Sequence, residues 1–119
     1  MEEAELAEVM ARLYEAELLD DQAYAVQYAA DKRELRGWGP DRIRQALRQR
    51  GVPEAFIEQA VDVEDADEQL ERAVGLLAER ELGCESDAER GRALQLLVRR
   101  GFPLEVGYAA VRDRESRAA

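Results

Sequence analysis

An internal repeat restricts this chain to a small set of folds. The segment RQRGVPEAFIEQAV, residues 48–61, aligns without gaps with VRRGFPLEVGYAAV, residues 98–111. Both copies place a glycine after a basic residue, a proline two positions later and an Ala-Val pair near the end. A period of about 50 residues indicates small units that stack on their neighbours, because one such unit buries too little apolar surface to be stable alone.

Each unit is predicted to contain three helices, since apolar residues recur at helical spacing along both copies. Residues 3–17 form one expected helix, and Asp20 or Asp21 is expected to cap the next helix by accepting its free N–H groups. The predicted fold class is all-α, with roughly seven helices in tandem three-helix repeats that form an extended or curved array. The expected divisions are residues 1–19 as the last helix of an incomplete first repeat, 20–64 as the second repeat and 65–119 as the third.

The sequence Gly37-Trp38-Gly39-Pro40 predicts a tight corner between two helices. Glycine supplies the backbone freedom that a sharp turn requires, and proline is favoured at the first position of the helix that follows. Gly51 is expected to end that helix. We interpret Trp38 as a packing wedge between helices rather than as an exposed contact.

The residue types that are missing argue against an enzyme. The chain has no histidine, threonine or asparagine, and its serines are Ser86 and Ser116. These absences exclude a Ser-His or Cys-His nucleophile and a histidine metal ligand. No glycine-rich phosphate loop occurs either. We therefore predict a protein with no catalytic residues, no metal site and no cofactor.

Cellular location is inferred from the cysteine content and from hydropathy. Cys84 is the single cysteine, so an intramolecular disulfide is impossible, which fits a reducing compartment. The sequence contains no apolar run of about 18 residues and opens without a signal peptide. The expected location is the cytoplasm, without membrane association.

The charge distribution identifies a candidate binding segment. The net charge is −10, from 17 basic and 27 acidic residues. Residues 32–50 nevertheless hold seven basic residues against two acidic ones, whereas residues 54–71 hold eight acidic residues and no basic one. The candidate partner-binding residues are Lys32, Arg33, Arg36, Arg42, Arg44 and Arg48, with the last three expected to carry the contact.

Two kinds of partner fit this basic segment. A short arginine-bearing helix after a tight turn is typical of DNA readers, but such readers add base-reading side chains that are scarce here, and the acidic flanks oppose phosphate attraction. The guanidinium fork suits carboxylates on a protein equally well. Tyr24 and Tyr28 are interpreted as core or half-core residues rather than as a base-stacking platform. A protein partner is favoured, and a nucleic-acid-binding module acting on DNA directly is the alternative.

Residues 18–52 resemble the central repeat of the RecX proteins, bacterial regulators of the RecA recombinase. The resemblance is carried by an apolar pair followed by Asp20-Asp21, then Gly37-x-Gly39-Pro40, Arg42-Ile43, Leu47 and Gly51. The segment from Arg99 to Pro103 is similar to part of that family's third repeat. The likeness covers the whole chain, is strongest across residues 18–61, and leaves the first repeat represented by its last helix.

The resemblance implies a tandem array of three-helix repeats without catalytic activity. It further implies binding in the groove of the RecA filament on DNA, with inhibition of its ATPase, strand-exchange and co-protease activities. Several relatives in this family are basic, so the acidic charge of this chain predicts that any direct DNA contact is weak. The apolar surface left by the absent helices predicts a tendency to self-associate.

Overall fold

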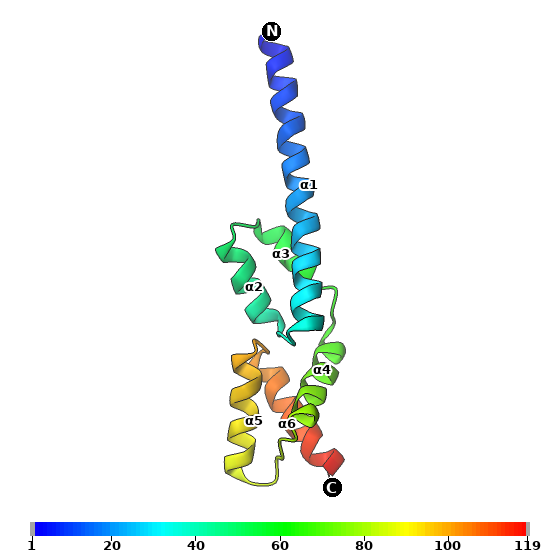
Figure 1. Cartoon of the computed structure of the whole chain (residues 1–119), viewed down its shortest axis with the longest axis vertical. Coiled ribbons are helices and arrows are strands. Elements are labelled where there is room, and N and C mark those ends of the chain that lie inside the picture. The colour runs from blue at the N-terminus through cyan, green and yellow to red at the C-terminus, as the bar shows by residue number, and fades with distance from the viewer. Residues whose placement is uncertain (1, 119) are drawn as a thin grey trace.

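The computed structural model describes residues 2–118 and arranges them as an elongated array of helices (Figure 1). Its principal extents are 73 × 21 × 19 Å. The described residues form no strand and six helices, namely α1 Glu3–Leu35, α2 Pro40–Gln49, α3 Glu54–Val61, α4 Ala66–Glu79, α5 Asp87–Arg99 and α6 Leu104–Ala118. The prediction of an all-α, extended array is confirmed.

Helix α1 runs without interruption from Glu3 to Leu35, so the predicted break near Asp20 and Asp21 is wrong. Both aspartates lie inside this helix, and neither caps a helix start. The residues around them include no glycine or proline, and a continuous helix keeps the backbone N–H and C=O groups of this stretch hydrogen-bonded. The two helices expected before the corner are therefore one, and residues 2–118 contain six helices instead of seven.

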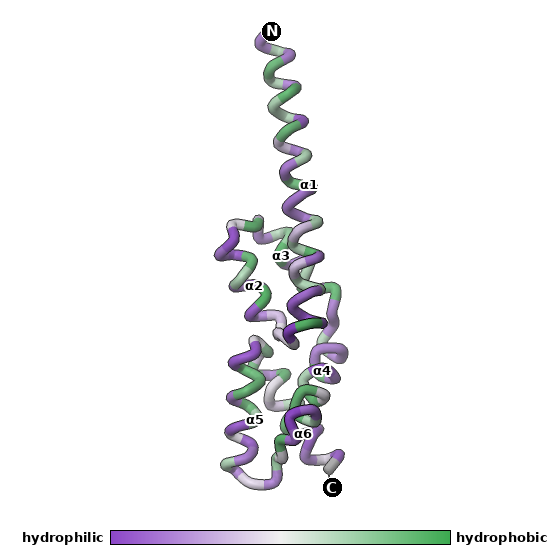
Figure 2. Tube along the Cα trace, viewed as in Figure 1, coloured by the Kyte–Doolittle hydropathy of each residue, from purple (hydrophilic) through white to green (hydrophobic). Residues whose placement is uncertain are grey.

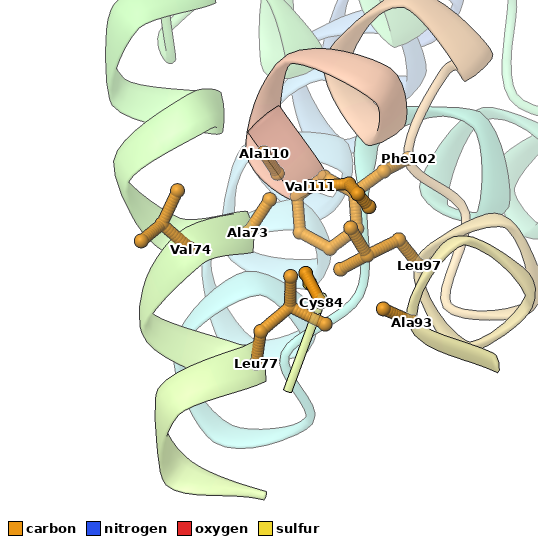
Figure 3. Packing of buried hydrophobic residues seen from close by; sticks show 9 residues of the cluster. All are labelled: Ala73, Val74, Leu77, Cys84, Ala93, Leu97, Phe102, Ala110 and Val111. Atoms are coloured by element: carbon orange, nitrogen blue, oxygen red, sulfur yellow. The ribbon is translucent and has the colours of Figure 1, made fainter. Parts of the chain in front are cut away.

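Two separate hydrophobic cores lie along the long axis. The first joins the C-terminal half of α1 to α2 and α3, and its buried residues are Ala25, Ala29, Ile43, Leu47, Val52, Ile57, Ala60 and Val61. The second lies among α4, α5 and α6 (Figure 3), and its buried residues are Ala73, Val74, Leu77, Cys84, Ala93, Leu97, Phe102, Ala110 and Val111. Each set of three helices thus buries its own apolar faces.

The burial pattern of α2 recurs in α5. Every position from 41 to 49 has the same degree of burial as the position 50 residues later. The fully buried Ile43 and Leu47 have the fully buried counterparts Ala93 and Leu97. The repeat in the sequence is therefore also a repeat in the structure.

The N-terminal half of α1 projects beyond the first core (Figure 1). Residues 2–17 are all exposed, and Met10 and Leu13 keep 58% and 60% of their surface accessible. Figure 2 shows hydrophobic and hydrophilic residues alternating along this segment. An apolar stripe without a partner is the kind of surface on which self-association was predicted.

Local sequence explains where three of the helices begin. Gly39 precedes α2 and Pro40 is its first residue, so the absent N–H of proline costs no hydrogen bond. Asp65 and Glu68 form a capping box at α4, in which each side chain accepts from the other residue's N–H. The Ser86 hydroxyl accepts from an N–H in the first turn of α5.

The two three-helix units meet at a joint made of backbone atoms. The N–H of Gly39 donates to the carbonyl of Arg100 at 2.7 Å, and the N–H of Asp41 donates to the carbonyl of Gly101 at 2.9 Å. These N–H groups lie at the start of α2, where a helix leaves its donors free, and the carbonyls directly follow α5. The end of α5 therefore caps the start of α2, and the two helices stand one above the other on the same side of the molecule (Figure 1).

The joint leaves no room for a side chain at Gly39. A Cβ there would lie 2.4 Å from both the carbonyl carbon of Gly101 and the nitrogen of Phe102. The φ angle of Gly39 is −79°, so close packing, and not an unusual backbone conformation, requires glycine at this position. Gly37 and Gly51, with φ angles of +66° and +79°, supply the left-handed conformations of the two turns that flank α2.

We predict that Gly39→Ala destabilises the fold, because the added methyl group would overlap backbone atoms that cannot move separately. The expected loss in the free energy of unfolding is about 1–3 kcal/mol. Gly75→Ala is the matched control, since Gly75 lies inside α4 with open space around it and should gain roughly 0.5–1 kcal/mol from the better helix former. Urea unfolding followed by circular dichroism measures both, and a Gly39→Ala variant as stable as the unaltered chain would contradict the joint.

Candidate functional site

The basic side chains fall into two groups, those that form an ion pair with a carboxylate of this chain and those that do not. Of the 17, seven form ion pairs: Arg12, Arg33, Arg44, Arg48, Arg72, Arg90 and Arg117. Within residues 2–118, no carboxylate lies at ion-pair distance from the other ten: Lys32, Arg36, Arg42, Arg50, Arg80, Arg92, Arg99, Arg100, Arg112 and Arg114. The predicted binding residues divide equally between the groups.

Arg44 and Arg48 face carboxylates within their own unit. Arg44 Nε donates to Glu58 Oε1 at 3.0 Å, and Arg48 Nε donates to Glu54 Oε1 at 3.0 Å. The hydrogen bond between Arg48 and Glu54 raises the pKa of the guanidinium and lowers the pKa of the carboxyl. Both arginines therefore bind α2 to α3, although each retains some exposed surface.

Arg33 belongs to a buried ion network that connects the two units. Its Nε lies 3.7 Å from Glu64 Oε1, and its Nη2 donates to the Ala60 carbonyl at 3.1 Å. Glu64 is 7% exposed and also accepts from Arg72, which extends from α4. Arg72 donates in turn to the Trp38 carbonyl at 2.9 Å. Arg33 thus supports the fold from a position with little access to a partner.

Lys32 and Arg42 lie against the aromatic ring of Trp38. The Lys32 ammonium is 4.9 Å from the ring centroid, and the Arg42 guanidinium carbon is 4.2 Å from it. Trp38 is half-buried and packs against the first core, with Tyr28 edge-on at 6.5 Å between ring centroids. Trp38 therefore serves both as a packing residue and as a platform that fixes two cations.

The same surface contains a shallow hollow of about 260 Å³. Trp38 and Arg42 line it together with Gln45, Ala46 and Gln49 of α2. Fixed cations attract carboxylates and phosphates, and glutamine amides donate hydrogen bonds to both. The hollow is therefore suited to an anionic group on a larger partner. Arg36 lies outside this hollow, exposed at the end of α1.

Arg50 extends the aromatic and cationic surface toward α1. Its Nε donates to the Tyr24 hydroxyl at 2.8 Å, and its guanidinium carbon lies 4.8 Å from the Tyr28 ring centroid. Tyr28 is half-buried as expected, whereas Tyr24 is 45% exposed and lies outside the core. Arg50 is not among the predicted binding residues, although the sequence places it one residue before the glycine that ends α2.

Glu64 and Arg72 were also missed as functional positions. In the sequence Glu64 is one acid in an acidic run, and nothing in its spacing distinguishes it from Asp62 or Asp67. The burial of Glu64 depends on how α4 folds back against the corner at Trp38, which no local pattern predicts.

Three further observations concern metal binding, membrane spanning and the reactivity of the cysteine. Among residues 2–118, no group of three or more Cys, Asp or Glu side chains is placed to hold a metal ion. None of the described helices is long and apolar enough to cross a membrane. Cys84 is buried in the second core, and this burial raises the pKa of its thiol, which keeps the side chain protonated and unreactive.

These features define a class of protein: an array of three-helix units that presents unpaired cations on its surface. A family model described as RecX, second three-helix domain, matches residues 20–61. A regulatory protein RecX from Thermus thermophilus is 33% identical, over 92% of this chain and 70% of the relative. The chain belongs to the RecX family.

Two further relatives show the extent of the match. A regulatory protein RecX from Bacillus velezensis is 29% identical over 92% of this chain, which spans 43% of that relative's length. The crystal structure of RecX from Lactobacillus salivarius superposes with a TM-score of 0.75 at 23% identity, covering 97% of this chain and 77% of the other. That similarity supports the fold of the array.

We predict that Glu64→Gln destabilises the chain strongly. The substitution removes the carboxylate while leaving the largely buried guanidinium groups of Arg33 and Arg72 in place. The expected loss is about 3–5 kcal/mol in the free energy of unfolding, as for other buried charges left without a partner. Asp62→Asn is the control, because Asp62 is exposed and should change stability by less than about 0.5 kcal/mol. Equal stabilities of the two variants would rule out the network as a structural element.

Proposed function

We propose that this chain is a non-enzymatic regulator that binds the RecA filament on DNA. In this proposal it lowers the ATPase, strand-exchange and co-protease activities of RecA during recombination and the SOS response, in the cytoplasm. The observation that carries the proposal is membership of a family whose relatives are named regulatory protein RecX. The chain spans about two fifths of the Bacillus velezensis relative, so the regulatory activity is proposed for the part of the protein that this chain represents.

The proposed contact uses the cations that no carboxylate neutralises. Among the predicted binding residues these are Lys32, Arg36 and Arg42. Arg44 and Arg48 already hold carboxylates of α3, and exchanging one carboxylate partner for another gains little free energy. Lys32 and Arg42 are also held against Trp38, so less side-chain entropy is lost when they bind a partner.

The first experiment is hydrolysis of ATP by RecA on single-stranded DNA, with and without this chain. Inhibition at a fixed ratio of chain to RecA is the expected result. An unchanged rate over a wide range of chain concentrations would contradict the proposed regulation.

Direct action on DNA is the competing outcome. Binding driven by phosphate contacts weakens steeply and log-linearly with salt, because it releases condensed counterions. The chain carries a net charge of −10, so we expect little binding to DNA that lacks RecA even at low salt. Strong salt-dependent binding to bare DNA would favour the nucleic-acid-binding function over the proposed one.

We predict that the double substitution Lys32→Gln, Arg42→Gln weakens inhibition, because it removes two cations that are free to bind a partner. The concentration needed for half-inhibition should rise about tenfold, equivalent to about 1.4 kcal/mol. The matched control Arg44→Gln, Arg48→Gln removes the same positive charge from residues already paired within the chain, and should change that concentration by less than about twofold. Equal effects of the two double variants would contradict the assignment of the contact to the unpaired cations.

A further inference from the structure

A second cationic hollow lies on the unit formed by α4, α5 and α6. It measures about 310 Å³ and is lined by Arg80, Arg92 and Arg99, with Leu82, Gln95 and Leu96 completing it. None of the three arginines has a carboxylate at ion-pair distance in the part of the chain that the structure describes. All of the predicted binding residues lie in the other unit, between positions 32 and 48.

The second hollow occupies the same place in its unit as the hollow beside Trp38. Arg92 and Gln95 stand 50 residues after Arg42 and Gln45, at positions of matching burial in α5 and α2. Arg99 corresponds in the same way to Gln49. The repeat therefore places an anion-binding surface at equivalent positions in both units, although the second lacks a tryptophan.

The C-terminal ends of α1 and α4 supply another pair of equivalent cations, Lys32 in the last turn of α1 and Arg80 directly after α4. The repeat offset between these two helices is 48 residues, as the buried pairs Ala25 with Ala73 and Ala29 with Leu77 indicate. At that offset Lys32 corresponds to Arg80, which lines the second hollow.

A third hollow lies where the two units meet. Arg36, Arg80 and Arg100 line it at the junction of the units, together with Gly37, which precedes Trp38. Arg80 is shared with the hollow on α5. The backbone joint stacks α5 against α2 on one side of the molecule (Figure 1), so the helices that carry the first two hollows follow one another along the long axis.

We infer that the three hollows form a single docking surface, the cationic strip, defined by the lining residues Arg36, Arg42, Arg80, Arg92 and Arg99 and by Lys32, which lies against Trp38. Its occupant is an acidic protein surface that extends over both units. The identity of that protein as the RecA filament rests on the proposed function. The strip extends the contact beyond the central repeat, to cations on α5 and at the end of α4. These cations contribute as much to the free energy of binding as the cations around Trp38 do.

The pattern of charge along the strip favours carboxylates on a protein over a nucleic-acid backbone. Glu34 and Glu79 line the junction hollow together with its arginines. A phosphate backbone carries charge at a uniform, close spacing and would face these two carboxylates as well as the arginines. A folded protein surface places carboxylates at separate points, and so matches cations while avoiding acids.

The test is equilibrium binding of the intact chain to RecA filaments assembled on immobilised single-stranded DNA. The double variant Arg92→Gln, Arg99→Gln should raise Kd about tenfold or more, similar to Lys32→Gln, Arg42→Gln. Arg44→Gln, Arg48→Gln removes equal charge outside the strip and should leave Kd within about twofold. Circular dichroism spectra and melting temperatures establish that each variant is folded.

The outcomes separate this inference from the proposed function. If the unaltered chain binds the filament and Arg92→Gln, Arg99→Gln binds equally well, the strip is overturned while the regulatory proposal survives. If the unaltered chain does not bind, the proposed function fails, and the strip loses its assigned partner. If the chain instead binds bare DNA through Arg92 and Arg99 with a steep salt dependence, the assignment to an acidic protein surface is overturned.

Discussion

The elongated shape depends on the backbone joint between the end of α5 and the start of α2. Two N–H groups that α2 leaves free are satisfied by two carbonyls that follow α5, at 2.7 and 2.9 Å. The hydrogen bonds also align the two helices so that the partial negative charge at the end of one meets the partial positive charge at the start of the other. The two cores do not merge, so this joint and the ion network of Glu64 fix the orientation of one unit relative to the other.

The joint also explains how an acidic protein presents a basic surface. Four of the paired arginines, Arg33, Arg44, Arg48 and Arg72, hold helices together within a unit or across the junction, where Glu54, Glu58 and Glu64 neutralise them. Among the unpaired cations, Arg42 on α2 and Arg92 on α5 instead lie at positions that the repeat duplicates. Stacking those helices end to end brings the duplicated positions into line. Acidic residues elsewhere, including those on the projecting half of α1, keep the net charge at −10 and weaken attraction to bulk nucleic acid.

Much of this architecture follows from local patterns. Apolar periodicity and the spacing of glycine and proline predicted the helical repeat, because a helix start, a helix end and a buried face depend mainly on neighbouring residues. A helix boundary was predicted at Asp20 because Asp20 and Asp21 resemble a helix cap. Good helix formers on both sides of the two aspartates instead keep α1 continuous. The basic segment, residues 32–50, could be recognised from its composition alone. Which of its arginines are neutralised depends on contacts such as Arg44 with Glu58 and Arg33 with Glu64, and these form only when the chain folds.

The central claim is that unpaired cations, with Lys32 among them, meet carboxylates of RecA. Lys32 is the single lysine of the chain, which makes its amine a selective probe. A carbodiimide joins an amine to a carboxylate without a spacer, so only groups in direct contact become linked. Treating the chain bound to RecA filaments and mapping the products by mass spectrometry should give a cross-link between Lys32 and an aspartate or glutamate of RecA. Filament binding without any cross-link from Lys32 to RecA would contradict the account.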